Sequence, residues 1–378
     1  MNPLTQSKNT TILPVLIALT LTAMTAVKGV LAIIMNTSSA PSSARQITDP
    51  RGMNKTGRTR LAAIFRWPLL LALLVLPHMV QAQWTATVGA QTDEKGIQAL
   101  AFLPNEIWIH AGDRIAWTFQ ADETHTVTFL RAGQVRPDFN VGCPGFSSDP
   151  AIFDGSTCVT TPAMVTGQTF TVIFPVAGNF KLTCLVHVNM DGRIHVLPVS
   201  DPLPHDQAFY DEQAASRTDE LLSHGAKMKP LHVPNSPLGV TAGITDITGT
   251  AGGTETVAAV RFSHENIRIR AGQTVEWDNQ APIFPHTITF GQEPANLQNP
   301  SPDVTVDPDG ARHAIIASTA DSTHSGFIIA APQERRGLPQ APLGVTRFRV
   351  TFPNPGVFPY ICALHDEMGM VGQVTVTP

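Results

Sequence analysis

The feature that most constrains this chain is a pattern of residues that occurs twice along its 378 positions. Ala111-Gly112-Asp113 recurs 160 positions later as Ala271-Gly272-Gln273. The segment from Phe170 to Cys184 recurs 178 positions later as Phe348 to Cys362. Self-similarity over this length predicts two copies of one domain within the chain.

The composition and the apolar pattern of both copies predict β structure. Charged residues make up 15% of the chain, which also contains 28 Gly and 31 Pro, a composition typical of turn-rich β domains. Apolar runs and alternations between Gly, Asn and Asp predict strands at 98–102, 107–110, 114–119, 170–174, 180–183, 194–197, 257–262, 267–269, 274–277, 348–352, 358–361 and 373–377. Residues 207–224 contain no Gly or Pro and predict a helix that ends at Gly225.

The second copy contains a soft set of metal ligands near the C-terminus. Cys362, His365 and two methionines lie within nine residues, and such a set selects copper over magnesium, calcium or manganese. A trigonal copper site also needs a second imidazole. His286 is the candidate, because it begins an alternating stretch typical of a strand.

The first copy repeats this ligand set. Cys184, His187 and Met190 form the loop, and His125 supplies the distant imidazole. A lone strand histidine or buried methionine is usually a structural residue. The joint pattern, present twice, favours a metal site in each copy.

The residues around both loops resemble those of the cupredoxins. Phe-Pro-His before a strand, followed by Tyr-x-Cys-x-x-His-x-x-x-x-Met-x-Gly, is similar to plastocyanin, and His-x-x-Met-Gly-Met is similar to pseudoazurin. The resemblance implies His286, Cys362, His365 and Met370 as ligands of a type 1 copper. The shorter Cys-x-x-His-x-x-Met of the first copy is similar to amicyanin. An all-β protein of two tandem Greek-key β-sandwich domains, joined by a short helical linker, is expected.

Two questions about the ligands stay open at this point. Met368 matches the spacing of Met190 to its histidine, whereas Met370 matches its register to the following strand. The first copy has Asp122-Glu123-Thr124 where the second has Phe-Pro before the histidine. No ligand is lost. The difference would give the coppers of the two sites different reduction potentials, or would leave the first site degenerate.

Two cysteines remain after the metal loops are assigned. Cys143 and Cys158 flank a stretch rich in Gly, Pro and Ser. In an oxidising compartment they would most simply form a disulfide, and the competing interpretation is two free thiols.

The first 82 residues differ from the rest. They hold eight basic residues and one acidic residue, whereas residues 83–378 carry a net charge of −12. A basic segment at 54–60, an apolar core at 68–77 and Val80-Gln81-Ala82 predict a secretory signal, for which Met53 is the favoured start. A second apolar stretch at 11–35 would be a membrane anchor if it were made and retained.

We therefore expect an N-terminal extension and signal at 1–82 (the signal at about 53–82), cupredoxin-like domains at 83–199 and 237–378, and a linker with a helix at 200–236. The expected function is that of an exported, periplasmic or secreted electron carrier with two type 1 coppers. Its partners would be redox proteins, not nucleic acid, and only the N-terminal segment would associate with a membrane.

Two rival functions stay open. A copper carrier or store would bind copper(I) without redox cycling. A copper enzyme of the two-domain laccase or nitrite reductase type is disfavoured, since the chain has no His-x-His, and Thr183 and Ile361, not histidines, precede the two cysteines.

Overall fold

A computed structural model describes residues 82–143, 145–228, 238–279, 281, 283–329 and 345–378. They lie within one compact unit, His78–Pro378. Apart from Ala82, the predicted N-terminal extension and signal lies outside the described residues. Among the residues that are described, no helix is both long and apolar enough to cross a bilayer.

The first domain is a sandwich of two sheets. One contains β2, β1, β4, β8 and β6, and the other contains β3, β10, β9, β5 and β7. The strands, in chain order, are β1 (Gln83–Gln91), β2 (Ile97–Leu103), β3 (Glu106–His110), β4 (Arg114–Phe119), β5 (Thr128–Phe129), β6 (Ala151–Ile152), β7 (Val159–Thr160), β8 (Thr169–Ile173), β9 (Gly178–Thr183) and β10 (Asp191–Leu197).

The second domain repeats this arrangement. Its sheets contain β12, β11, β14, β19, β17 and β16 on one side, and β13, β21, β20, β15 and β18 on the other. The strands are β11 (Gly239–Gly249), β12 (Thr254–Ser263), β13 (Asn266–Arg270), β14 (Gln273–Asp278), β15 (Thr289–Phe290), β16 (Thr305–Val306), β17 (Arg312–Ile315), β18 (Thr323–His324), β19 (Arg347–Phe352), β20 (Gly356–Ile361) and β21 (Val371–Thr377).

Every second side chain along most of the strands is buried, and these side chains form the cores of both domains. In β4, Ile115, Trp117 and Phe119 point inward, and the residues between them are partly exposed. Trp117 and the corresponding Trp277 of β14 are fully buried. Because side chains alternate across a strand, this pattern places one apolar face of each sheet against the other. The all-β tandem prediction is confirmed.

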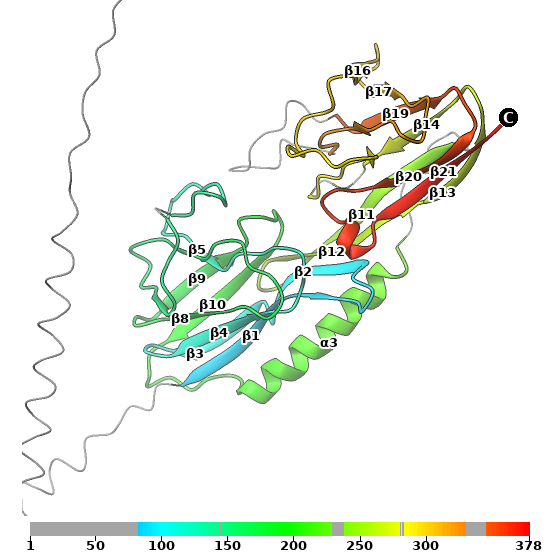
Figure 1. The fold of residues 1–378 in the computed structure, drawn as a ribbon. Coiled ribbons are helices and arrows are strands. Elements are labelled where there is room, and N and C mark those ends of the chain that lie inside the picture. The colour runs from blue at the N-terminus through cyan, green and yellow to red at the C-terminus, as the bar shows by residue number, and fades with distance from the viewer. Residues whose placement is uncertain (1–81, 144, 229–237, 280, 282, 330–344) are drawn as a thin grey trace, which may run out of the picture. The chain divides into compact units, whose positions relative to one another are not determined.

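The two domains share one sheet. β12 pairs antiparallel with β2, from Leu100 opposite Thr256 to Ile97 opposite Ala259, which makes a continuous eleven-stranded sheet (Figure 1). The helix α3 (Gln207–Gly225) packs across this seam, where Leu221 joins a small apolar cluster with Ala99 and Val257. The predicted helical linker therefore also packs against the strands of both domains.

Polar contacts fasten α3. The Asp206 side chain caps its first turn by accepting a hydrogen bond from the Phe209 amide. Tyr210 is buried and its hydroxyl accepts a 2.9 Å hydrogen bond from the amide of Trp108 in β3. Further along, Arg217 pairs with the buried Glu255 of β12 at 2.7 Å.

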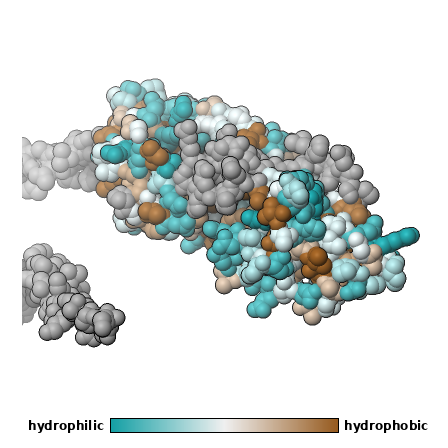
Figure 2. Space-filling model, turned by 90° about the horizontal axis from the view of Figure 1, so that it is seen from above, coloured by the Kyte–Doolittle hydropathy of each residue, from teal (hydrophilic) through white to brown (hydrophobic). Residues whose placement is uncertain are grey.

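The surface is mixed in character. On the face shown in Figure 2, hydrophobic residues lie in separate small groups among hydrophilic and neutral ones. Val135, Val141 and Phe146 are the exposed large apolar residues of the loop between β5 and β6. Scattered apolar residues of this kind are ordinary on a protein surface.

Candidate metal centres

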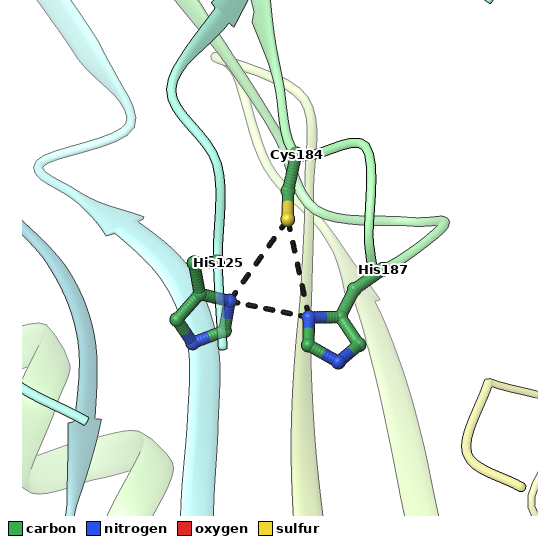
Figure 3. Close-up of side chains that lie close together, drawn as sticks. All are labelled: His125, Cys184 and His187. Carbon is green, nitrogen blue, oxygen red and sulfur yellow. Dashed lines mark hydrogen bonds between the residues drawn. The ribbon is translucent and has the colours of Figure 1, made fainter. Parts of the chain in front are cut away.

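In the first domain, three ligand atoms from separate segments converge (Figure 3). His125 precedes β5, whereas Cys184 and His187 lie in the loop after β9. The Cys184 sulfur is 4.0 Å from Nδ1 of His125 and 3.9 Å from Nδ1 of His187, and the two nitrogens are 3.2 Å apart. All three side chains are buried.

The second domain has the same arrangement with tighter spacing. The Cys362 sulfur is 3.7 Å from Nδ1 of His286 and 3.4 Å from Nδ1 of His365, and the nitrogens are again 3.2 Å apart. The structure thus brings together the predicted imidazoles and thiol of each domain.

These two triangles fit a transition metal. A point equidistant from the three ligand atoms lies about 2 Å from each in both triangles, close to the roughly 2.0–2.3 Å of metal–nitrogen and metal–sulfur bonds. Two imidazoles and one thiolate, buried away from water, form the soft trigonal set that suits copper. Each domain therefore has residues that could hold one metal ion.

Two threonines brace the cysteines. The amides of Thr126 and Thr287, each following a ligand histidine, donate 3.4 Å hydrogen bonds to the sulfurs of Cys184 and Cys362. Their hydroxyls accept from the backbone amide after each cysteine, at 2.7 Å and 2.8 Å. The motif His-Thr occurs in both copies of the sequence, and this recurrence is the signal that could have identified them.

The predicted methionines are buried in equivalent places. Met190 and Met370 are fully buried, and their carbonyls accept 3.0 Å hydrogen bonds from the amides of Cys184 and Cys362. Met368 instead ends the short helix η2 (Asp366–Met368). The backbone pairing thus makes Met370 the counterpart of Met190, and its axial role stays a prediction.

Two glycines make room for the strand histidines. Gly89 and Gly243 sit at irregularities of β1 and β11 with φ of +69° and +72°. A Cβ at Gly89 would lie 2.8 Å from Nε2 of His125, and a Cβ at Gly243 would overlap Nε2 of His286. Left-handed backbone and lack of a side chain are both required there.

The electrostatics favour the thiolates. Burial acts to raise the pKa of Cys184 and Cys362, but their contacts with the ligand histidines hold both well below the usual thiol value. Burial likewise acts to lower the pKa of His187 and His365, yet the thiolates and Glu123 raise them to about 9 and about 10. These contacts favour the thiolate form of each cysteine, which is the form that binds a metal.

Glu123 lies between the two centres. One carboxylate oxygen is 3.1 Å from Nε2 of His187, and the other is 3.4 Å from Nε2 of His365 in the other domain. Although burial opposes ionisation, these two histidines hold the pKa of Glu123 well below its usual value. Sequence reasoning noted this residue only as a departure from Phe-Pro. Glu123 stands two residues before His125, where the other copy has Phe284. This difference between the two copies is the sequence signal that could have identified Glu123 as a site residue.

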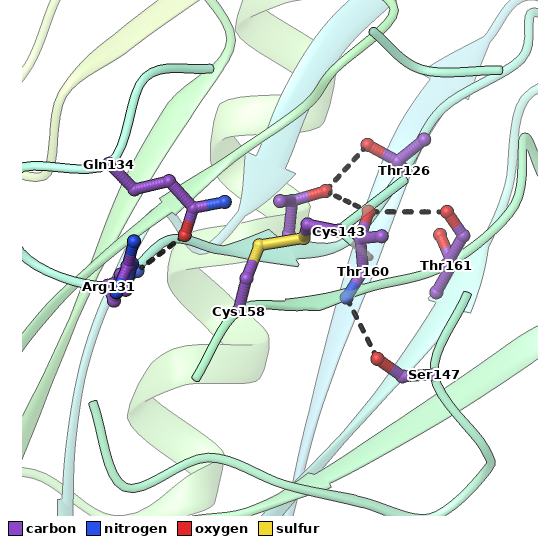
Figure 4. Close-up of a disulfide and its surroundings, with 9 residues drawn as sticks. Thr126, Arg131, Gln134, Cys143, Ser147, Cys158, Thr160 and Thr161 are labelled. Atoms are coloured by element: carbon purple, nitrogen blue, oxygen red, sulfur yellow. Dashed lines mark hydrogen bonds between the residues drawn. A yellow bond between two sulfur atoms is a disulfide. The ribbon is translucent and has the colours of Figure 1, made fainter. Parts of the chain in front are cut away.

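Cys143 and Cys158 form the expected disulfide, so the interpretation as free thiols is wrong (Figure 4). Cys158 directly precedes β7, whose Thr160 hydrogen-bonds Thr128 of β5 through the hydroxyls. The disulfide thus fastens the long loop after β5 beside the strand that follows His125.

The remaining histidines show no paired spacing, and most of them are expected on the surface or in solvated loops: His110, His195, His205, His224, His232, His264, His313 and His324. Six of the seven that the structure describes are at least partly exposed, as expected, and His232 lies outside the described residues. His324 is instead buried, between the Thr289 hydroxyl at 2.8 Å and the Leu297 carbonyl at 3.0 Å. It occupies the place beside β15 that Thr160 holds beside β5.

Comparison with known proteins gives a family match for the sequence of the second domain. Residues 250–377 match the sequence model of copper binding proteins of the plastocyanin/azurin family. Among solved structures, the chain is similar to amicyanin from Paracoccus versutus, with 18% identity over 30% of this chain and 81% of that one, and a TM-score of 0.21. A reduced amicyanin variant shows 16% identity over 31% and 83%, also with a TM-score of 0.21.

Proposed function

We propose, from the match of residues 250–377 to the plastocyanin/azurin family of copper-binding proteins, that the chain is an exported electron-transfer protein with one type 1 copper in each domain. The observation that carries the proposal is the pair of buried His–Cys–His triangles, His125–Cys184–His187 and His286–Cys362–His365. Met190 and Met370 would be the weak axial ligands.

Bound copper would supply one-electron chemistry by alternating between copper(I) and copper(II). The protein contributes a rigid cage. Amide hydrogen bonds hold each sulfur, and Gly89 and Gly243 let the backbone pack directly against the strand imidazoles. Ligands held in this way need little rearrangement when the charge of the site changes, which favours rapid electron transfer.

Export is part of the proposal. The disulfide between Cys143 and Cys158 suits an oxidising compartment, and the sequence before Gln83 has the pattern of a secretory signal. The donor and acceptor would be redox proteins outside the cytoplasm. N-terminal sequencing of the exported protein should begin at Gln83, whereas recovery of residues 11–35 in a membrane fraction would support an anchor.

The copper count and the visible spectrum of the purified chain test the function. Two coppers and intense thiolate-to-copper absorption are expected, and Cys184→Ala and Cys362→Ala should each remove one copper and one part of the band. One copper in the unaltered chain, with no effect of Cys184→Ala, would remove the first centre from the proposal.

Two other outcomes would point to the rival functions. Two coppers with little visible absorption would indicate a copper(I) carrier or store. Turnover of oxygen or nitrite by protein of defined metal content would indicate an enzyme.

A further inference from the structure

The junction between the two domains contains one carboxylate that contacts both candidate centres. Oε1 of Glu123 faces His187, and Oε2 faces His365, at 3.1 Å and 3.4 Å. The Glu123 side chain is only 10% exposed, and the two imidazoles are 3% and 5% exposed. Both contacts are therefore shielded from water.

The protonation of the two rings follows from their orientation. Nδ1 of His187 and of His365 points into its own ligand triangle, so Nε2 carries the proton when Nδ1 binds a metal. Both Nε2–H groups then donate to Glu123, one to each oxygen. An ionised carboxylate accepts both hydrogen bonds, whereas an amide has one oxygen and would turn an N–H donor toward the other ring.

A phenyl ring completes the junction. Phe284 is buried, and its ring centre lies 5.1 Å from that of His187 and 5.7 Å from that of His365. Glu123 and Phe284 each stand two residues before the strand histidine of their domain. The same position in the two copies therefore holds a charged residue in one and an apolar residue in the other, and both contact the two loop histidines.

We propose that Glu123 couples the two centres, as a positioning residue for both loop histidines and as the path by which an electron passes between the metals. The proposal rests on the function proposed above. The path runs from the His187 ring through the carboxylate to the His365 ring. One centre is oxidised as the other is reduced, both Nε2 protons stay on their rings, and no further reactant is required.

The charge of Glu123 has a second effect. A negative group beside both rings stabilises the more positive, oxidised form of each centre. Removing that charge should therefore raise the midpoint potentials of both centres together. A residue that merely helped one domain to fold would not do this.

Glu123→Gln and Glu123→Asp test the proposal in the copper-loaded full chain. Glu123→Gln keeps the length and removes the charge, and should lower copper affinity about 10- to 100-fold at both centres, as loss of a ligand's hydrogen-bond partner does. It should also raise both potentials and slow the exchange of an electron between centres after flash reduction. Glu123→Asp keeps the charge but is too short to reach both rings, so it should slow the exchange with smaller shifts in potential.

The matched control is Glu106→Gln. Glu106 contacts His195 at 3.0 Å, an equivalent carboxylate–imidazole pair that touches neither centre. This variant should leave affinity, potentials and exchange unchanged. Circular dichroism of each variant reports whether the fold is retained.

The contact across the domains is tested separately in a Cys184→Ala background, where only the second centre can bind copper. Glu123→Gln should still raise the potential of that centre through His365. No shift in this background, or an unchanged exchange rate in the full chain, would overturn the proposal. Absence of a two-copper spectrum in the unaltered protein would instead reject the proposed function on which this inference rests.

Discussion

At the residue scale, each centre depends on the residues that contact its ligand histidines as much as on the ligands themselves. Nε2 of His125, which points away from the ligand triangle, lies against Gly89 and has no hydrogen-bond partner among the described residues. Nε2 of His187 and Nε2 of His365 face Glu123. The strand histidines are thus positioned by close packing, and the loop histidines by a charge.

Gly243 provides a direct test of that packing. Gly243→Ala should displace His286 and abolish the blue absorption of the second centre, because the new methyl group would occupy the place of the ring. Gly272→Ala is the matched control. Its φ of +85° gives similar backbone strain, about 1–3 kcal/mol, but its Cβ would meet nothing within 4 Å. An intact second centre in Gly243→Ala would contradict this account.

The two methionines of the second loop provide another test. Met370→Leu should shift the potential and the spectrum of the second centre, because Met370 is fully buried and pairs with Cys362 as Met190 pairs with Cys184. Met368→Leu should leave both nearly unchanged. Visible spectroscopy and redox titration of the two variants decide the matter, and the reverse result would mean that loop spacing sets the axial ligand.

At the element scale, α3 contributes to stability through a buried charge pair. Arg217→Met should lower the free energy of unfolding by on the order of 2 kcal/mol, because it leaves Glu255 buried and unpaired. The cost is below that of a fully buried pair because Arg217 is 21% exposed. Denaturant unfolding measures it.

Glu220→Gln is the control for that measurement. Glu220 contacts the same Arg217 but is 68% exposed, so this variant should change stability very little. Equal effects of the two substitutions would show that burial of the pair is irrelevant.

The elements also show how far sequence patterns reach. The strands flanking the metal loops were predicted to within a few residues, since their alternation is regular and Gly and Pro mark their ends. β1 and β11 were missed, because each is broken by a left-handed glycine and has a mixed pattern. The same two glycines pack against the imidazoles of His125 and His286. The irregularity that prevented prediction of these strands is therefore part of the metal site.

Long-range contacts limited the prediction of the site. Cysteine, histidine and methionine spacings are local and appear in the sequence, so both triangles could be proposed from it. Glu123 meets His365 across 242 positions, and only the shared sheet brings them together. No local pattern encodes that contact.

At the scale of the whole molecule, the seam between β2 and β12 should make the two domains unfold together. Calorimetry of the metal-free protein is expected to give a single transition whose calorimetric and van't Hoff enthalpies agree. Val257→Asp, which places a charge in the buried seam cluster, should split it into two. Ile247→Asp, at a position 40% exposed on β11, should not. Two transitions in the unaltered protein would contradict this expectation.

The seam has one further consequence. Two separate carriers exchange electrons only when they collide, so their exchange slows on dilution. Here a pair of hydrogen-bonded strands sets the separation of the two centres, in place of a loose tether. Exchange between them would be unimolecular, at a rate independent of protein concentration and insensitive to solvent viscosity.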